Sequence, residues 1–219
     1  MSDVRILFRK TGRAVYISHL DLMRTMQRVF IRSGLKLRHS EGFNPHPIMV
    51  FALPLSVGVE SGCELLDVSL LEDIPLSEIP GRLNPCMPEG IEAVSAYVPG
   101  RKLRELFWLE VETTLEYDSG VPAGAVDRLN SLYSRETLII NKKSKKGYSD
   151  TDIAPCIGYV EVKEEGKTVL LHSLVTAQAP ALNPENLVHA IRQLMPELTP
   201  DFARHTRLEV YDRERKLFR

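Results

Sequence analysis

The segments VRILFR (residues 4–9) and SHLDLMRTMQRVFIRSG (residues 18–34) lie near the N-terminus and carry different periodicities. Apolar residues recur at every second position of the first segment, which predicts a β-strand. The second segment has a serine three residues before an aspartate, as at the start of a capping box, and it closes with a glycine. We therefore expect a helix from His19 to Ser33. The side chains expected to face a sheet are Leu20, Met23, either Met26 or Gln27, and Phe30.

The rest of the first half predicts a β-α-β-β-α-β order of elements. A turn at 11–13 and a short extended stretch at 14–17 lead into the helix. β-favouring residues then follow a loop that is rich in glycine and proline. The further elements that we expect are a strand over 48–60, a turn at 61–62, a strand over 63–71, a helix over 75–83 and a strand over 91–98. This order is the ferredoxin-like arrangement.

The second half repeats this scheme without a close repeat of the sequence. Alternating apolar residues again precede a helix that opens with proline, and a hairpin pattern follows later. The expected elements are a strand over 107–117, a helix over 122–134, a strand over 137–142, a polar loop, paired strands over 157–163 and 168–177, a helix over 184–195 and a strand over 207–211. We predict an α+β fold in which two ferredoxin-like (β-α-β-β-α-β) halves, residues 1–100 and 105–219, pack together.

Cysteine usage and hydropathy indicate the cellular compartment. Cys63, Cys86 and Cys156 lie far apart and are odd in number, which suits neither a disulfide framework nor a zinc motif. The first ten residues are too charged for a signal peptide, and no apolar run reaches the length of a membrane span. We therefore expect a cytoplasmic protein that does not enter a membrane.

Charge is unevenly distributed, although the net charge of the chain is only −1. Residues 1–50 contain nine Lys or Arg and three acidic residues, a net charge of +6 against −7 for the remainder. Such a segment is a candidate for a face that binds anions. The alternative is a chance excess of basic residues over a short stretch.

Three arginines of the predicted helix recur at every fourth residue. Arg24, Arg28 and Arg32 therefore line one helix face, where they suit successive phosphates of a nucleic acid. A solvated helix face is the alternative. His19, at the first helical position, could contact a phosphate or act as a general base, or it could be a surface histidine without a chemical role.

The loop HSEGFNPHP (39–47) combines a glycine, two prolines and an aromatic residue. Glycine permits unusual backbone angles and the prolines stiffen the chain, so Phe43 and Asn44 would lie on a braced loop. There, an aromatic ring beside an amide suits stacking on an unpaired base and hydrogen bonding to it. Alternatively, Phe43 is buried and plugs the loop.

The same loop contains residues that often bind metals. His39, Glu41 and His46 follow a spacing that matches no strong ligand pattern, so we expect no metal site. His46 is a second candidate for a general base, beside His19.

A second basic segment, NKKSKKGY (141–148), lies in the other half. Several lysines with an aromatic residue nearby suit a flexible loop that contacts phosphates, although many such runs are only solvated loops. The lysines are Lys142, Lys143, Lys145 and Lys146. The chain has no P-loop, no Rossmann glycine pattern, no nucleophile elbow and no CxxxCxxC iron–sulfur motif, so we expect no cofactor.

Three motifs together resemble one known family: YISHLDLMR (16–24), SEGFNPHP (40–47) and LPLSVGVES (53–61). This is the radical-SAM-associated family called domain of unknown function 2344. The resemblance covers nearly the whole chain, is specific in the first 70 residues, and extends to KKSKKG with the following Asp-Ile at 152–153. It implies that members are fused to, or encoded beside, a radical-SAM protein, often near genes for an RNase E/G-type ribonuclease and ribosomal proteins. It implies no activity and no catalytic residue.

These patterns favour an RNA-binding accessory protein that presents RNA to a radical-SAM partner, in RNA modification or processing linked to translation. The arginines, the 39–47 loop and the lysines would form its binding surface, and a binding role is favoured over an enzymatic one. One alternative is a metal-independent RNA-processing enzyme that uses His19 or His46 as general base. Tandem ferredoxin-like halves also build the CRISPR repeat-processing endoribonucleases, which is an analogy of fold alone. Another alternative is a pure protein-interaction subunit.

Overall fold

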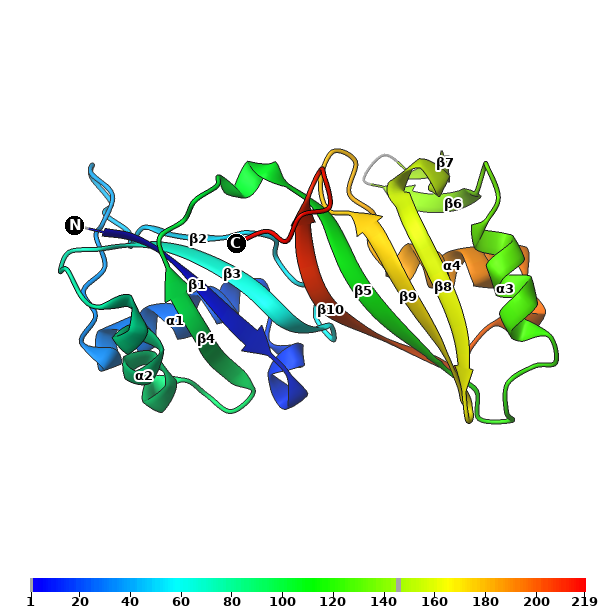
Figure 1. Ribbon diagram of the computed structural model, residues 1–219, viewed down its shortest axis with the longest axis horizontal. Helices are drawn as coiled ribbons and strands as arrows, with labels where there is room; N and C mark the ends of the chain where they lie inside the picture. The colour runs from blue at the N-terminus through cyan, green and yellow to red at the C-terminus, as the bar shows by residue number, and fades with distance from the viewer. Residues whose placement is uncertain (1, 145–146) are drawn as a thin grey trace. The chain divides into compact units, whose positions relative to one another are not determined.

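The computed structural model describes residues 2–144 and 147–219 and divides the chain into two compact units. The first unit is Met1–Glu105 with Arg219, and the second is Leu106–Phe218. Each unit contains an antiparallel sheet and helices, so the predicted α+β class is confirmed (Figure 1).

The first unit has the predicted order of elements. They are β1 (Ser2–Lys10), α1 (His19–Ser33), β2 (Met49–Phe51), β3 (Glu60–Leu70), α2 (Ile79–Leu83) and β4 (Ile91–Tyr97). The strands lie in the order β4-β1-β3-β2, and each neighbouring pair is antiparallel. This is the sheet order of a ferredoxin-like unit, in which the crossover through α1 skips one strand.

Helix α1 begins and ends where its capping residues require. The Ser18 hydroxyl accepts a hydrogen bond from the Asp21 amide at 3.2 Å, and Gly34 follows the helix in the left-handed conformation at φ 72°. The buried face of α1 joins one core cluster with β1, β3 and α2, so both helices cover the same face of the sheet (Figure 1). Met26 and Phe30 face this core as predicted, whereas Leu20 is 59% exposed and does not.

Three local expectations in this unit were wrong. Residues 12–16 form a 3₁₀ turn rather than an extended stretch. The strand expected over 48–60 is limited to β2. The segment that follows β2 in the sequence contains Pro54, which has no amide hydrogen to donate to a neighbouring strand. The turn lies at 56–59, where the Val59 amide donates to the Ser56 carbonyl, and the expected turn at 61–62 is part of β3.

The second unit repeats the ferredoxin-like order with an inserted hairpin. Its elements are β5 (Leu106–Glu116), α3 (Ala125–Tyr133), β6 (Ile139–Ser144), β7 (Gly147–Asp152), β8 (Ile157–Glu165), β9 (Thr168–Thr176), α4 (Glu185–Leu194) and β10 (Phe202–Asp212). The main strands lie in the order β10-β5-β9-β8, again antiparallel throughout. Without β6 and β7, this is the same order as in the first unit.

The inserted hairpin corrects the expectation of a strand over 137–142 followed by a polar loop. The strand exists, but it pairs with β7, from Ile139 opposite Asp152 to Ser144 opposite Gly147, in a separate two-stranded sheet. It is anchored on α4, because the Gln193 side chain accepts a hydrogen bond from the Asn141 amide at 2.8 Å. The polar segment therefore gains strand structure from its partner rather than from its own apolar pattern.

Candidate functional site

The three arginines of α1 all extend into solvent, because the opposite face of the helix is buried in the core. Arg24 forms an exposed ion pair with Asp21 at 3.2 Å. Within the described part of the chain, Arg28 and Arg32 have no ion-pair partner. We call Arg24, Arg28 and Arg32 the arginine stripe. Because an exposed ion pair such as that of Arg24 with Asp21 contributes little free energy, all three arginines remain available to an anionic ligand.

His19 lies at the start of the same helix but is partly occupied in packing. Its ring is half-buried and meets the ring of Phe51 edge-on, with centroids 5.3 Å apart and an interplanar angle of 86°. Phe51 belongs to β2, so this contact joins the N-terminus of α1 to the edge strand of the sheet. This packing contact gives the His19 ring a structural role that requires no catalytic function.

The 39–47 loop is a narrow excursion whose base is closed by hydrogen bonds. The Ile48 amide donates to the Arg38 carbonyl at 2.8 Å, and the Ser40 amide donates to the His46 carbonyl at 2.9 Å. The Ser40 hydroxyl also lies 2.9 Å from Nδ1 of His46. These contacts brace the loop at its base, as the glycine and prolines indicated.

The tip of this loop projects into solvent. Gly42 adopts φ 123°, a conformation that a residue with a side chain rarely adopts, and it turns the chain before Phe43. Phe43 is fully exposed, and Asn44 beside it is exposed as well. Phe43 is therefore not a buried plug. Its ring and the adjacent amide are both accessible to a ligand.

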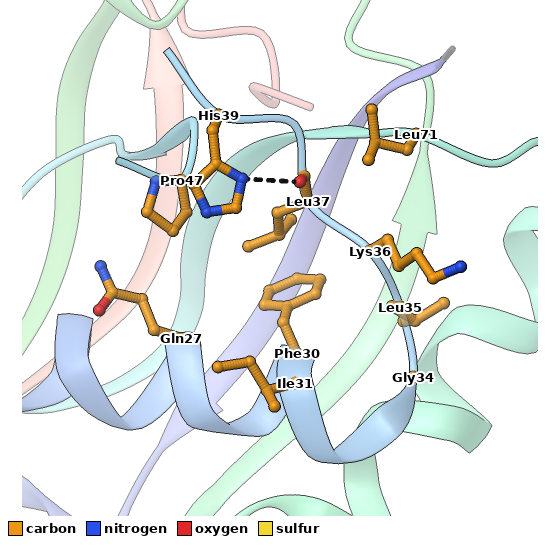
Figure 2. Close-up of a pocket in the computed structure, with 10 residues that line it drawn as sticks. All are labelled: Gln27, Phe30, Ile31, Gly34, Leu35, Lys36, Leu37, His39, Pro47 and Leu71. Atoms are coloured by element: carbon orange, nitrogen blue, oxygen red, sulfur yellow. Dashed lines mark hydrogen bonds between the residues drawn. The ribbon is translucent and has the colours of Figure 1, made fainter. Parts of the chain in front are cut away.

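A pocket of about 500 Å³ lies between α1 and the segment that follows it (Figure 2). Phe30 and Leu37 form its floor, and Ile31 stands on its rim with 79% of its surface exposed. Gln27 and His39 lie at one end and Lys36 at the other. The further lining residues are Gly34, Leu35, Pro47 and Leu71. The pocket thus adjoins both the arginine stripe and the base of the 39–47 loop.

Sequence reasoning missed this pocket because it depends on the tertiary position of Leu71, directly after β3, beside α1. One local signal was present: Ile31 is an apolar residue next to Arg32, on the solvated side of the helix. An exposed isoleucine in a stripe of charge indicates either an accidental surface residue or a contact surface.

The predicted lysine site is described only in part. Lys142 lies on β6 and is half-buried, and the backbone of Lys143 pairs with Tyr148 across the hairpin. Lys145, Lys146 and the side chain of Lys143 lie outside the described residues.

The histidines of the loop have protein partners. Nδ1 of His39 lies 3.2 Å from the Leu37 carbonyl, and Nδ1 of His46 contacts Ser40. Across residues 2–144 and 147–219, no group of three or more His, Cys, Asp or Glu side chains is arranged to hold a metal ion. In the same ranges, no helix is long and apolar enough to cross a membrane.

The protein is thus an α+β chain of two ferredoxin-like units, with a cationic helix face, an exposed aromatic loop and an adjacent pocket in the first unit. It belongs to the family described as "Uncharacterized protein conserved in bacteria (DUF2344)", whose model matches residues 4–184. This confirms the family that the three sequence motifs indicated. No curated protein matches the sequence at a significant level.

Among solved structures, the chain resembles one from the crystal structure of a Cbf5-Nop10-Gar1 complex. The two share 14% sequence identity with a TM-score of 0.52, over 93% of this chain and 48% of the other. This protein therefore spans about half the length of that chain. At this level of identity, the similarity concerns the fold.

Proposed function

We propose that the protein binds RNA and works as an accessory factor of a radical-SAM partner in RNA modification or processing linked to translation. The observation that carries the RNA-binding part is the arginine stripe, in which Arg28 and Arg32 are exposed and free of carboxylate partners in the described chain. Successive arginines lie about 6 Å apart along the helix axis, since a helix rises about 1.5 Å per residue. Such a row can follow consecutive phosphates of a strand.

The exposed ring of Phe43 supports RNA over other polyanions. Unpaired bases are recognised by stacking on aromatic side chains and by hydrogen bonds to their edges, while cations hold the backbone. The 39–47 loop offers a ring and an amide on a base closed by hydrogen bonds, so it is held before the ligand arrives. A preorganised loop loses less conformational entropy when it binds.

The radical-SAM partner rests on the family resemblance. The chain itself has no CxxxCxxC motif, and its three cysteines are widely spaced. The iron–sulfur chemistry would therefore come from the partner, with this protein supplying the RNA. If the two proteins are produced together, we expect RNase-treated samples to retain the complex, and RNA to bind the complex more tightly than the partner alone.

The RNA-binding proposal is tested by measuring affinity for a fluorescent single-stranded RNA by anisotropy across a range of salt concentrations. Wild-type binding should weaken steeply with salt, and Arg28→Glu with Arg32→Glu should reduce the slope of log K against log[salt] by about 0.7 for each lost phosphate contact. Arg135→Glu is the matched control, because Arg135 is exposed in the second unit without an ion-pair partner in the described chain. Salt-independent binding, or an equal effect of Arg135→Glu, would contradict the proposal.

A second candidate function is RNA cleavage with His46 as general base. One observation favours His46 over His19: Nδ1 of His46 is oriented by the Ser40 hydroxyl at 2.9 Å, as a neighbouring group orients many catalytic histidines. Labelled RNA incubated with wild type, His46→Ala and His19→Ala distinguishes the cases. Cleavage that is lost only in His46→Ala supports this function, and equal products in all three samples remove it.

A further inference from the structure

The pocket beside the arginine stripe combines apolar walls with polar groups at its two ends (Figure 2). Its volume of about 500 Å³ lies within the range of roughly 300–1,000 Å³ that is usual for small-ligand sites. Such sites are mostly apolar, with a few polar groups that fix the orientation of the ligand. The polar groups here are Gln27, His39 and Lys36.

Gln27 and His39 together offer hydrogen-bond donors and acceptors at one end of the pocket. A carbonyl can only accept, so Nδ1 of His39 carries the hydrogen that it donates to Leu37 at 3.2 Å. In the neutral ring, Nε2 is then an acceptor. The amide of Gln27 provides both a donor and an acceptor. Two such side chains can read the edge of a planar heterocycle.

Lys36 lies at the opposite end, where it forms an ion pair with Glu72 at 3.0 Å. Both side chains of this pair are well exposed, so the pair contributes little and can be exchanged. A phosphate that arrives at this end would meet the exposed ammonium group of Lys36 at the rim. The same end lies near the C-terminus of α1, where Arg32 adds positive charge.

We propose that this pocket holds one unpaired nucleotide of an RNA strand that follows the arginine stripe. The base packs against the exposed side chains of Ile31 and Leu71, its edge meets Gln27 and His39, and a phosphate contacts Lys36. This inference rests on the proposed RNA-binding function. It also explains why Ile31 is left exposed on a charged helix face, because a base would cover it.

RNA is favoured over an apolar protein segment by the placement of the polar groups. An apolar helix that docks in a groove needs no base-reading groups at its ends, whereas a base needs both a flat apolar contact and edge contacts. The pocket also continues into the base of the loop that carries Phe43, since His39 and Pro47 pair across that base. One continuous surface therefore presents cations, a stacking ring and a pocket.

The test compares four fluorescent 12-nucleotide RNAs, containing only A, C, G or U, against wild type and Gln27→Leu. Gln27→Leu keeps the approximate shape of the side chain but removes the hydrogen bonds. We expect it to narrow the spread between the tightest and weakest oligomer by about 5-fold or more. The salt dependence should stay that of the wild type, because no phosphate contact is lost.

A second pair of variants separates the pocket from simple charge. Ile31→Asp and Leu20→Asp add the same charge to exposed positions of α1, and only Ile31 lines the pocket. Ile31→Asp should weaken binding several-fold more than Leu20→Asp. Circular dichroism checks that each variant keeps the fold.

The outcomes distinguish this inference from the proposed function. If Arg28→Glu weakens RNA binding while Gln27→Leu leaves the ranking of the four oligomers unchanged, the pocket assignment is wrong and the RNA function stands. If wild type binds none of the oligomers, both fail. If a synthetic Glu-rich amphipathic peptide binds wild type but not Ile31→Asp, and displaces no RNA, the pocket is a protein-docking site and the inference is overturned.

Discussion

Gly90 occupies a position where only glycine fits. Its backbone has φ +84°, and an added Cβ atom would collide with the carbonyl oxygen of Thr11 and lie 2.9 Å from the Cβ of Ala14. The carbonyl of Gly90 also accepts the Thr11 amide at 2.8 Å, so the two segments cannot separate without losing this bond. The turn before β4 therefore holds the segment that leads into α1.

We expect Gly90→Ala to lower the free energy of unfolding by about 2–4 kcal/mol, through backbone strain and steric overlap. Urea denaturation followed by circular dichroism measures this change. Gly81→Ala is the control, because a Cβ at Gly81 in α2 meets nothing within 4 Å and alanine favours a helix. A loss of stability in Gly81→Ala as large as that in Gly90→Ala would contradict the steric argument.

Phe43 provides a second prediction at the scale of one residue. Because its side chain is fully exposed, replacing it can change RNA binding without changing the stability of the fold. If its ring stacks on a base, Phe43→Ala should weaken RNA binding by about 1–3 kcal/mol, or roughly 5- to 150-fold. Phe43→Tyr keeps an aromatic face and should bind nearly as well as wild type. The melting temperatures of all three proteins should agree, and an unchanged affinity in Phe43→Ala would remove this residue from the binding surface.

At the scale of single elements, the start of α1 depends on one side chain. The Ser18 hydroxyl accepts the Asp21 amide, which would otherwise lack a partner in the first turn. Ser18→Ala should therefore cost about 1 kcal/mol of stability in urea denaturation. Ser18→Asn restores a capping oxygen and should recover most of the loss. Equal stability of the alanine variant and the wild type would show that the cap is not needed.

Helix α4 is attached to its sheet through a group that titrates. Oε2 of Glu185 lies 3.0 Å from Nε2 of His205, whose other nitrogen contacts Thr113 on β5. The hydrogen bond from His205 is the main cause of a lowered pKa at Glu185, and Arg192 contributes as well. The folded-state pKa is below the unfolded one, so the carboxylate stabilises the fold above the ordinary glutamate pKa of 4.5. This contribution is lost as the pH falls through the lowered folded-state pKa.

Glu185→Gln should therefore destabilise the protein at pH 7, and the difference from wild type should shrink as the pH falls below about 4. Urea denaturation of wild type and Glu185→Gln at pH 7 and again below about pH 4 measures the difference in the free energy of unfolding at each pH. Glu136→Gln is the matched control, because Glu136 is exposed in the same unit. A Glu185→Gln effect that does not change with pH would show that the contact acts through shape rather than charge.

Across the whole molecule, much of the element order could be predicted because local signals agreed with the fold. The cap at Ser18 and the glycine at Gly34 marked the bounds of α1, and both agree with the structure. The strand β7 could not be predicted, because its residues GYSDTD show no apolar alternation and pair only because β6 lies beside them. The arginine stripe, by contrast, could be predicted, because it follows from helical spacing alone. The pocket requires Leu71 and Gln27 to line the same cavity, which is a property of the folded chain.

The reactivity of the three cysteines tests the packing of the cores of both units. All are free thiols; Cys63 and Cys156 are buried, whereas Cys86 is half-buried. Under native conditions, a thiol reagent such as DTNB should modify Cys86 well before the other two, and all three should react at once in denaturant. The rates measured on Cys86→Ser identify the first site. Rapid native labelling of two or more thiols would contradict the packing of these cores.

The β6–β7 hairpin forms a two-stranded sheet separate from the main sheet, and it is fixed to the second unit at its base. Leu138 and Ile140 are fully buried at that base, and His189 on α4 contacts the Asn141 carbonyl at 2.9 Å. Farther along the hairpin, Tyr148 and Ser149 are exposed. Relatives of this protein can therefore lengthen, shorten or recompose the outer part of the insertion without disturbing the interior, while Leu138 and Ile140 must stay apolar. Natural variation in length and charge should concentrate beyond residue 141.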